Sequence, residues 1–600
     1  MILGELYDYY LRLLDEGAGL VPRQGWSIEK VSWKLPIARD GSLSEPIFLG
    51  GEGKDAPKYK LMMVPEHVSR PGTKPIPFFL CDTAAFLLGL DDKKGAAKRR
   101  ASCEMHLELL SECEGPEAEA LRAFFERDDA AEGLSDAMRE SLIAQGGLCV
   151  LSFIGGRCAH EVPEIASAWN SSRRVNDSNS RIGQCGITGE SGKLARLFPQ
   201  VSGIPGAQSS GASLVSFNQK SFESYGKQQT YNASLSDAVA FGAGAALKYL
   251  FQDNRHHVRF GNMTVIFWAD REASVEDALM LELLGGSGGA EDIETRQQVE
   301  AALKSIRSGK KLLAIDTSVR YYVLGISPNS ARLVVRFFEV GTLGELAENY
   351  GWYLRDIDIV RDTSLARQST SLLVLLRQTA LLGKDENLPA PLVNPCFRAL
   401  LRGSRFPSSL ETALLSRMRA DRGANNRWDM MDRASLMKAC LVRRRRLASR
   451  QVADSESEVT VALNRNNKNV GYLLGRLFAV KERAQQGAQG ANLNATIRDK
   501  YMSSAATTPG RVYGNLLGLY QKHVGTMRRD ATKGWIVHLV ERESEEIFGL
   551  LSGGEQPIPA TLGNDDQLMF YIGYYQERVG LWTKRSQDDA KQNENDNEEE

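Results

Sequence analysis

VRYYVLGISPNSARLVVRFFEVGTLGELAENYGWYL, residues 319–354, contains the change of pattern that decides the fold class. Its first part has two runs rich in β-branched and aromatic residues, 319–326 and 332–340, joined by Ser-Pro-Asn, which predicts a β-hairpin. From residue 343 the apolar residues recur every three or four positions, which predicts a helix. The stretch therefore marks the end of the strand-rich part of the chain.

Strand and helix patterns alternate before this stretch, and only helix patterns follow it. Runs at 31–37, 59–64, 148–154, 213–217 and 263–268 predict strands. Helices are expected at 3–16, at 80–90 with Asp82 as N-cap, at 100–127 with a break at Gly115-Pro116, and at 234–252 with Ser236 as cap. The sequence predicts an α+β N-terminal region with a mixed or antiparallel sheet, followed by an all-α helical bundle.

This pattern suggests four regions. We expect an α+β region over 1–342, a basic helical region over 343–454, a C-terminal helical bundle over 455–585, and a disordered acidic tail over 586–600, where SQDDAKQNENDNEEE lacks apolar anchors.

Charge is unevenly distributed along the 600 residues, although the net charge is only −1. Residues 398–450 contain 14 Arg and Lys against 4 Asp and Glu, and residues 104–140 contain 12 acids against 3 bases. Such separation indicates a charged partner at one end of the chain. The alternative is a solvated helical face, which is the favoured interpretation for the acidic block.

The eight cysteines form no C-x-x-C pair, so the sequence predicts neither a metal site nor a cofactor. Scattered thiols are typical of a reducing compartment. The N-terminal residues have early acids and no long apolar core, and no apolar run approaches the roughly 18 residues of a membrane span. We therefore expect a cytoplasmic protein with no membrane partner.

Several strings imitate catalytic motifs without their context. GITGESGK (186–193) has five residues between its glycines and Leu194 after the lysine, unlike a phosphate-binding loop. Residues 285–289 match G-x-S-x-G but consist almost wholly of glycine, and residues 224–227 match S-x-x-K without its partner motifs. We expect no catalytic residues, and a nuclease or hydrolase with an unrecognised site stays open as an alternative.

GAQSSGASLVSFNQKSFESYGKQQTYN, segment 206–232, is rich in small, hydroxyl and amide residues, with Glu223 as its one acid. Such a surface lets a nucleic acid come close, and its side chains can bond phosphate oxygens or base edges. The candidate DNA-binding residues are Gln208, Ser209, Ser210, Asn218, Lys220, Ser224, Tyr225 and Lys227. The alternative is a turn region that packs against the sheet, with Asn218 bonding backbone after the expected strand.

Arginines and lysines of the helical part are candidates for binding a single DNA strand or its backbone. They are Arg443, Arg444, Arg445, Arg446, Arg465, Lys468, Arg476, Lys500, Arg511, Arg528 and Arg529. Four consecutive arginines cover more than one helix face, so at least one must meet solvent or a partner. The alternative is a helix C-terminus that favours cations.

Segment 206–232 resembles the signature of the large subunit of type I-C CRISPR Cascade, an RNA-guided surveillance complex. FFLCDTAAFLLGLD (78–91), TVIFWAD (264–270), LNATIRDKYMSSAATTPGRVY (493–513) and MFYIGYYQER (569–578) are also similar to that family. The resemblance spans almost the whole chain. One departure is Phe198-Pro199, where the family often has His-Pro, so a chemical role for that position is not expected.

The resemblance implies a non-catalytic antiviral-defence subunit that recognises the protospacer-adjacent motif (PAM) on double-stranded target DNA. It implies help with duplex opening (R-loop formation), binding of the displaced single strand and recruitment of a helicase-nuclease. The implied partners are the CRISPR RNA ribonucleoprotein, the backbone and crRNA-end Cascade subunits, and small subunits similar to the chain's own C-terminal bundle. A purely structural scaffold is the remaining alternative.

Overall fold

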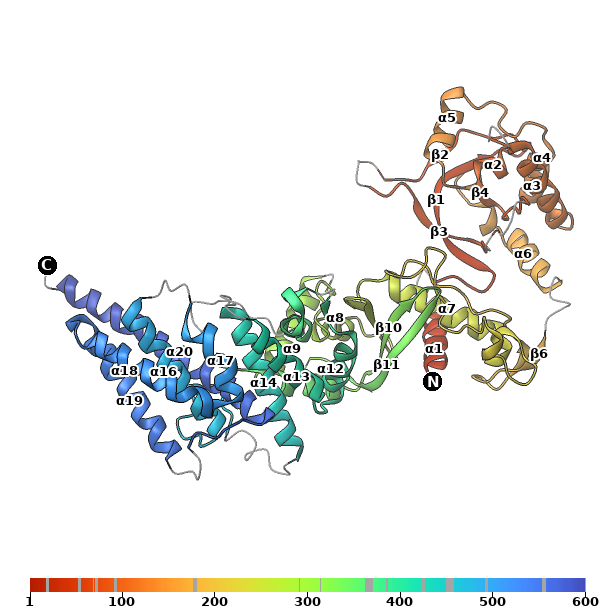
Figure 1. Ribbon diagram of the computed structural model, residues 1–600. Coiled ribbons are helices and arrows are strands. Elements are labelled where there is room, and N and C mark those ends of the chain that lie inside the picture. The colour runs from red at the N-terminus through yellow and green to blue at the C-terminus, as the bar shows by residue number, and fades with distance from the viewer. Residues whose placement is uncertain are drawn as a thin grey trace. The chain divides into compact units, whose positions relative to one another are not determined.

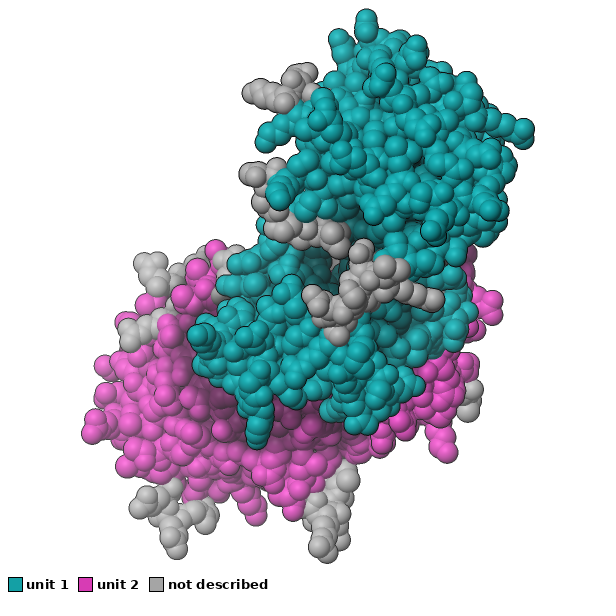
Figure 2. All heavy atoms as spheres, turned by 90° about the vertical axis from the view of Figure 1, so that its right-hand side faces the viewer, with its two compact units in different colours: residues 1–252, 328–333 teal, residues 253–327, 334–600 magenta. Residues whose placement is uncertain are grey.

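The computed structural model divides into two compact units. Unit 1 contains residues 1–252 and 328–333, and unit 2 contains residues 253–327 and 334–600 (Figure 2). The structure describes the chain except for residues 18–20, 52–55, 68–69, 71–73, 91–93, 176–180, 291, 313, 362–370, 385–386, 422–426, 449–457, 491–494, 553–556 and 599–600. Within the described residues, every helix is too short or too polar to cross a lipid bilayer.

The first sheet of unit 1 is mixed, with strand order β2-β1-β5-β4 and β3 paired to β1. Its strands are β1 (Trp26–Ile37), β2 (Ile47–Phe48), β3 (Lys60–Pro65), β4 (Cys81–Thr83) and β5 (Leu148–Phe153). β1 runs parallel to β5, and the other pairs are antiparallel. Val31, Trp33 and Leu35 alternate along β1 and are all buried, as a strand with one face on a core requires.

Helices beside this sheet supply the rest of its core (Figure 1). They are α2 (Ala84–Leu87), α3 (Gly95–Leu110), α4 (Pro116–Glu126), α5 (Asp136–Gln145), the 3-10 helix η1 (Ala159–Glu161) and α6 (Pro163–Val175). Pro116 at the first position of α4 is compatible with a helix start, because the missing N–H has no intrahelical acceptor there.

The remainder of unit 1 has few strands and long ordered loops. It contains α1 (Ile2–Asp15), the hairpin β6 (Ile182–Gln184) and β7 (Ser191–Lys193), the 3-10 helices η2 (Lys220–Phe222) and η3 (Gln229–Asn232), and α7 (Asp237–Gln252). α1 packs on α7, where Gly242 leaves room for the rings of Tyr7 and Tyr10. The hydroxyl of Ser236 accepts a hydrogen bond from the N–H of Val239 and begins α7.

Unit 2 starts with a four-stranded antiparallel sheet of order β11-β10-β9-β8. The strands are β8 (His257–Phe260), β9 (Met263–Ala269), β10 (Arg320–Asn329) and β11 (Arg332–Thr342), with α8 (Ser274–Leu283) and α9 (Ile293–Arg307) between β9 and β10. All residues of β9 are buried. The tip of the β10–β11 hairpin, residues 328–333, belongs to unit 1.

The described residues after 342 contain helices and no strand. The helices are α10 (Leu343–Ile357), α11 (Leu372–Leu376), η4 (Arg377–Thr379), η5 (Leu381–Gly383), α12 (Ala390–Arg402), α13 (Ser408–Ala420), α14 (Arg427–Ala448), α16 (Val470–Gln489), α17 (Ile497–Thr507), α18 (Pro509–Met527), η7 (Ala531–Lys533), α19 (Gly534–Leu551) and α20 (Asn564–Glu598). α16 and α20 lie side by side, because Gly471 and Gly475 of α16 and Gly573 of α20 let the two backbones touch.

The predicted fold class is confirmed: mixed and antiparallel sheets precede a helical part. Two local predictions are wrong. Asp82 does not cap a helix but lies in β4, where its carboxylate accepts hydrogen bonds from Arg70 and from the N–H of Phe78. Residues 214–217 form no strand; only Ala212 and Ser213 make isolated bridges.

The bounds of the four predicted regions stay predictions. α20 extends into the segment expected to be a disordered tail, but side chains after Trp582 lie outside the described part of the chain.

Candidate nucleic-acid interface

The turn at residues 206–211 exposes three polar side chains. Gln208, Ser209 and Ser210 are all exposed, and their side chains make no hydrogen bond to any described residue. Their backbone, in contrast, is held: the N–H of Gly211 donates to the carbonyl of Gln208 at 2.9 Å, and the N–H of Gln208 donates to the carbonyl of Ser330 at 3.3 Å. The side chains are therefore available to a ligand on a fixed backbone.

Gly211 is required where this turn meets the preceding strand-like segment. Val201 and Ala212 exchange two backbone hydrogen bonds of 2.9 Å. A Cβ at Gly211 would lie 2.9 Å from the carbonyl oxygen of Val201, and its φ of +100° is unfavourable for other residues. The glycine thus allows the close backbone approach that positions residues 208–210.

Tyr225 stands at the tip of a second turn with 97% of its side chain exposed. The N–H of Lys227 donates to the carbonyl of Ser224 at 3.0 Å, and both central residues, Tyr225 and Gly226, have positive φ of 52° and 68°. These values describe a type I′ turn, which rarely accepts a tyrosine at its first central position.

Asn232 holds this turn in place. Its Oδ1 accepts the N–H of Ser224 at 2.9 Å, and its Nδ2 donates to the carbonyls of Lys227 and Gln229 at 2.9 Å each. Three side-chain hydrogen bonds from one residue offset the strain of the turn. Lys227 is half-buried, and its Nζ donates to Ser234 at 3.4 Å, so it is less available than the exposed Lys220 and Ser224.

Asn218 is exposed, and it bonds a side chain that sequence reasoning missed. Its Oδ1 accepts a hydrogen bond from Nη2 of Arg332, in the hairpin tip. The Arg332 guanidinium also lies over the ring of Phe222, 4.7 Å from its centroid. The sequence predicted the hairpin but contained no signal for what its tip contacts, since Arg332 is 114 positions from Asn218.

The prediction that Arg443 binds a DNA strand is wrong, because every residue of α14 from Met430 to Arg443 is buried. Binding by Arg444–Arg446, which are partly exposed, stays a prediction. Arg443 is 0% exposed; its Nε donates to Asp356 at 2.9 Å, and its Nη1 donates to the carbonyls of Ala399 and Ser404. Burial lowers the pKa of Arg443.

The three arginines that follow Arg443 are ion-paired. Arg446 joins Arg443 on the same Asp356 carboxylate. Arg444 pairs with Glu411 and Asp565, and Arg445 pairs with Glu458 at 2.5 Å; both side chains are partly exposed. The basic character of this block in the sequence is therefore largely neutralised inside unit 2.

The other predicted cations of the helical part divide into two groups. Arg476 is 0% exposed and bonds Glu577 and Glu546, so its predicted contact with DNA is also wrong. Arg465 pairs with Glu543 and Glu546, which raise its pKa, and Arg528 pairs with Glu541. The four exposed cations without a partner among the described residues are Lys468, Lys500, Arg511 and Arg529.

α18 differs from its neighbours in carrying no acidic residue. Arg511 lies in its first turn, Lys522 is exposed further along it, and Arg529 follows its end. Gly514, Gly518 and Gly525 of this helix meet no atom within 4 Å of a Cβ built on them. Its outer face is therefore basic and unobstructed.

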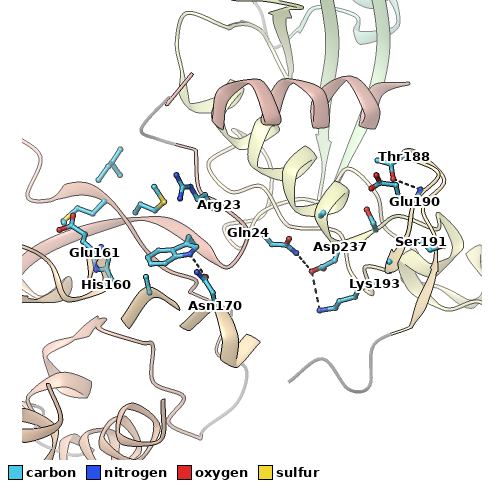
Figure 3. Close-up of a pocket in the computed structure, with 18 of the residues that line it drawn as sticks. Arg23, Gln24, His160, Glu161, Asn170, Thr188, Glu190, Ser191, Lys193 and Asp237 are labelled. Atoms are coloured by element: carbon cyan, nitrogen blue, oxygen red, sulfur yellow. Dashed lines mark hydrogen bonds and ion pairs between the residues drawn. The ribbon is translucent and has the colours of Figure 1, made fainter. Parts of the chain in front are cut away.

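A cavity of about 1070 Å³ lies in unit 1 (Figure 3). Gln24 donates to Asp237 at 2.8 Å, and Lys193 lies 3.7 Å from the same carboxylate. The lining contains three bases (Arg23, Lys60, Lys193) and three acids (Glu161, Glu190, Asp237). This balance does not favour a polyanion, so the cavity adds nothing to a DNA-binding surface.

One group of possible metal ligands occurs among the described residues: Cys158, His160 and Glu161, whose ligand atoms lie within 4.8 Å of one another. Glu161 already accepts the N–H of Cys158 at 2.8 Å as part of a helix cap. Burial raises the pKa of the Cys158 thiol to about 11 and lowers the pKa of His160 to about 4. These contacts explain why the three side chains lie close together: they form the cap at the start of η1.

A family model for CRISPR-associated proteins, Cas_Csd1, matches residues 6–582. The chain belongs to this family. The match covers both units, including segment 206–232 and all the helical cations discussed above. No curated protein matches the sequence. Membership of Cas_Csd1 supports a role in a CRISPR system and partnership within a Cas complex, which is the coarse form of what the resemblance implied.

Proposed function

We propose that this chain is the non-catalytic large subunit of a type I-C RNA-guided surveillance complex and that segment 206–232 recognises the PAM on duplex DNA. The observation that supports this best is the exposure of Gln208, Ser209 and Ser210 on a backbone fixed by hydrogen bonds to the hairpin tip. Amide and hydroxyl groups held in this way match the donor and acceptor pattern of base edges.

In the same proposal, the helical part holds the displaced strand and helps to recruit the helicase-nuclease. Lys500, Arg511 and Arg529 support the first role, because they are exposed cations near or on the acid-free helix α18. Cations on an unobstructed face neutralise phosphates without reading sequence. The buried Arg443 and Arg476 are not part of this surface.

The test uses the complex assembled from the full-length chain, its guide RNA and the other subunits. Its binding is measured against duplexes that match the guide and carry a randomised flank beside the matched segment. Replacing Gln208, Ser209 and Ser210 together by Ala should lower flank selectivity by about 1–3 kcal/mol per lost base contact. The melting temperature should stay unchanged, since these side chains make no hydrogen bond to the described chain.

A scaffold role gives the opposite pattern, with a lower melting temperature and intact selectivity. The absence of catalysis is tested separately by incubating the purified chain with labelled DNA and Mg²⁺ or Mn²⁺. Cleavage that disappears on changing a single acid would establish an enzyme and refute the non-catalytic proposal.

A further inference from the structure

Arg332 is held at the same surface by its backbone. The N–H of Ser213 donates to the carbonyl of Ala331 at 2.9 Å, and the N–H of Leu333 donates to the carbonyl of Ser213 at 3.0 Å. These two bonds flank Arg332 and form a parallel bridge between it and Ser213. The Cα of Arg332 therefore has a fixed position relative to the segment that carries Asn218.

The side chain of Arg332 is held as well. Asn218 accepts a hydrogen bond from Nη2, and the ring of Phe222 supports the face of the guanidinium at 4.7 Å. Stacking on an aromatic ring restricts the guanidinium to one plane. No described residue accepts a hydrogen bond from Nε, from Nη1 or from the second N–H of Nη2. One two-donor edge of the guanidinium, formed by Nη2 together with Nε or Nη1, is therefore left for a ligand.

The three exposed polar residues of the first turn are anchored to the same hairpin tip. Gln208 donates its backbone N–H to Ser330, two positions before Arg332, and Ser330 has a φ of 54°. The tip thus joins the turn at 206–211 to the segment 218–222. Residues separated by more than a hundred positions form one surface around a single oriented arginine.

We propose that Arg332, fixed by Asn218 and Phe222, is a base-reading residue that donates two hydrogen bonds to N7 and O6 of a guanine in the flanking duplex. This inference rests on the proposed function, because it assigns a residue and a base to the same recognition surface. Arginine bonding both acceptors of guanine is the commonest specific contact between proteins and DNA.

The surroundings of Arg332 favour a base over a phosphate. A surface that follows the DNA backbone needs several cations, since each neutralises one phosphate. Here the exposed residues anchored beside Arg332 are the uncharged Gln208, Ser209, Ser210 and Asn218, and segment 206–232 has one exposed cation, Lys220.

The experiment uses the assembled complex and the duplexes with a randomised flank. Arg332→Lys keeps the positive charge but loses the paired N–H donors of the guanidinium and its contact with the ring of Phe222. Phe222→Leu removes only the aromatic contact with Arg332. We expect Arg332→Lys to lower the preference for guanine at one flank position by roughly 5- to 150-fold, with little change at the other positions. Phe222→Leu should lower the same preference by a smaller factor.

Arg39→Lys is the matched control, because Arg39 is an exposed arginine of unit 1 with no partner among the described residues. It should leave every preference unchanged. Melting curves identify variants that fail to fold, and Phe222→Leu keeps the test valid if Arg332→Lys is one of them.

Three outcomes overturn the assignment. A wild-type preference in both Arg332→Lys and Phe222→Leu means that the arginine contacts no base. An equal loss of affinity for all flanks means that Arg332 binds a phosphate. If the wild-type complex itself shows no flank preference, the proposed function fails, and the assignment of Arg332 fails with it.

Discussion

A substitution of Arg443 distinguishes most clearly between an effect on stability and an effect on nucleic-acid binding. In Arg443→Met the hydrogen bond to Asp356 is lost, together with donors to the carbonyls of Ala399 and Ser404. Breaking a buried ion pair costs about 3–5 kcal/mol. Because Arg446 still pairs with Asp356, the loss of charge compensation is partial, and we expect the free energy of unfolding to fall by about 3 kcal/mol.

The comparison variant replaces three exposed cations, Lys500, Arg511 and Arg529, by Gln. None has a partner among the described residues, so stability should change by less than about 0.5 kcal/mol. If each neutralises one phosphate, the slope of log K against log salt for a labelled single strand should become shallower by about 2. Arg443→Met should leave this slope unchanged.

Both variants are studied as the full-length chain, by urea unfolding followed by circular dichroism and by strand binding between about 50 and 200 mM salt. A shallower slope in Arg443→Met without loss of stability would refute its burial in an ion pair. An unchanged slope in the triple variant would mean that this part of the helical region does not bind the strand.

Four further variants test particular contacts. Burial lowers the pKa of Lys481 from 10.5 to about 7. Between these two pH values the unfolded chain holds a proton that the folded chain lacks, so the free energy of unfolding should rise with pH. Lys481→Met should remove this rise in urea titrations at several pH values. Gly475→Ala should destabilise the chain because a Cβ would overlap the carbonyl of Phe570, whereas Gly518→Ala, with nothing within 4 Å, should stabilise it by about 1 kcal/mol in the same titrations; equal effects would contradict the close packing of α16 on α20. Tyr225→Gly should relax the turn and raise the melting temperature, yet weaken DNA binding by about 1–3 kcal/mol if the ring stacks on a base; unchanged binding would exclude that stacking.

Patterns with a clear period predicted the fold well. The repeat of apolar residues from residue 343 predicted the start of α10, which begins at Leu343 in the structure. The prediction of a strand at 213–217 failed because five apolar or small residues do not determine a strand without a partner, and of these five only Ser213 makes a bridge. Local pattern is decisive when it repeats over several turns and ambiguous when it is short.

The candidate site was predictable in part, for the same reason. Small and polar residues around Gln208 indicated an exposed turn, and the structure places them at the surface. Whether a cation is free depends on residues far away in the sequence, as Arg443 and Asp356 show with a separation of 87 positions. Arg332 was missed for the same reason, because the orientation of its side chain depends on contacts with Asn218 and Phe222, which are far away in the sequence.

The backbone of segment 206–232 carries strain that a scaffold would not need. Tyr225 and Gln229 have positive φ values of 52° and 49°, and Ser234, just beyond the segment, has 48°. Holding non-glycine residues in this region costs of order 1–3 kcal/mol each. Asn232 offsets this cost to keep in place a ring that is 97% exposed and therefore contributes little to packing within the chain. Strain maintained around an exposed aromatic side chain indicates a partner that contacts the ring. The strain therefore supports DNA recognition by segment 206–232 independently of Arg332.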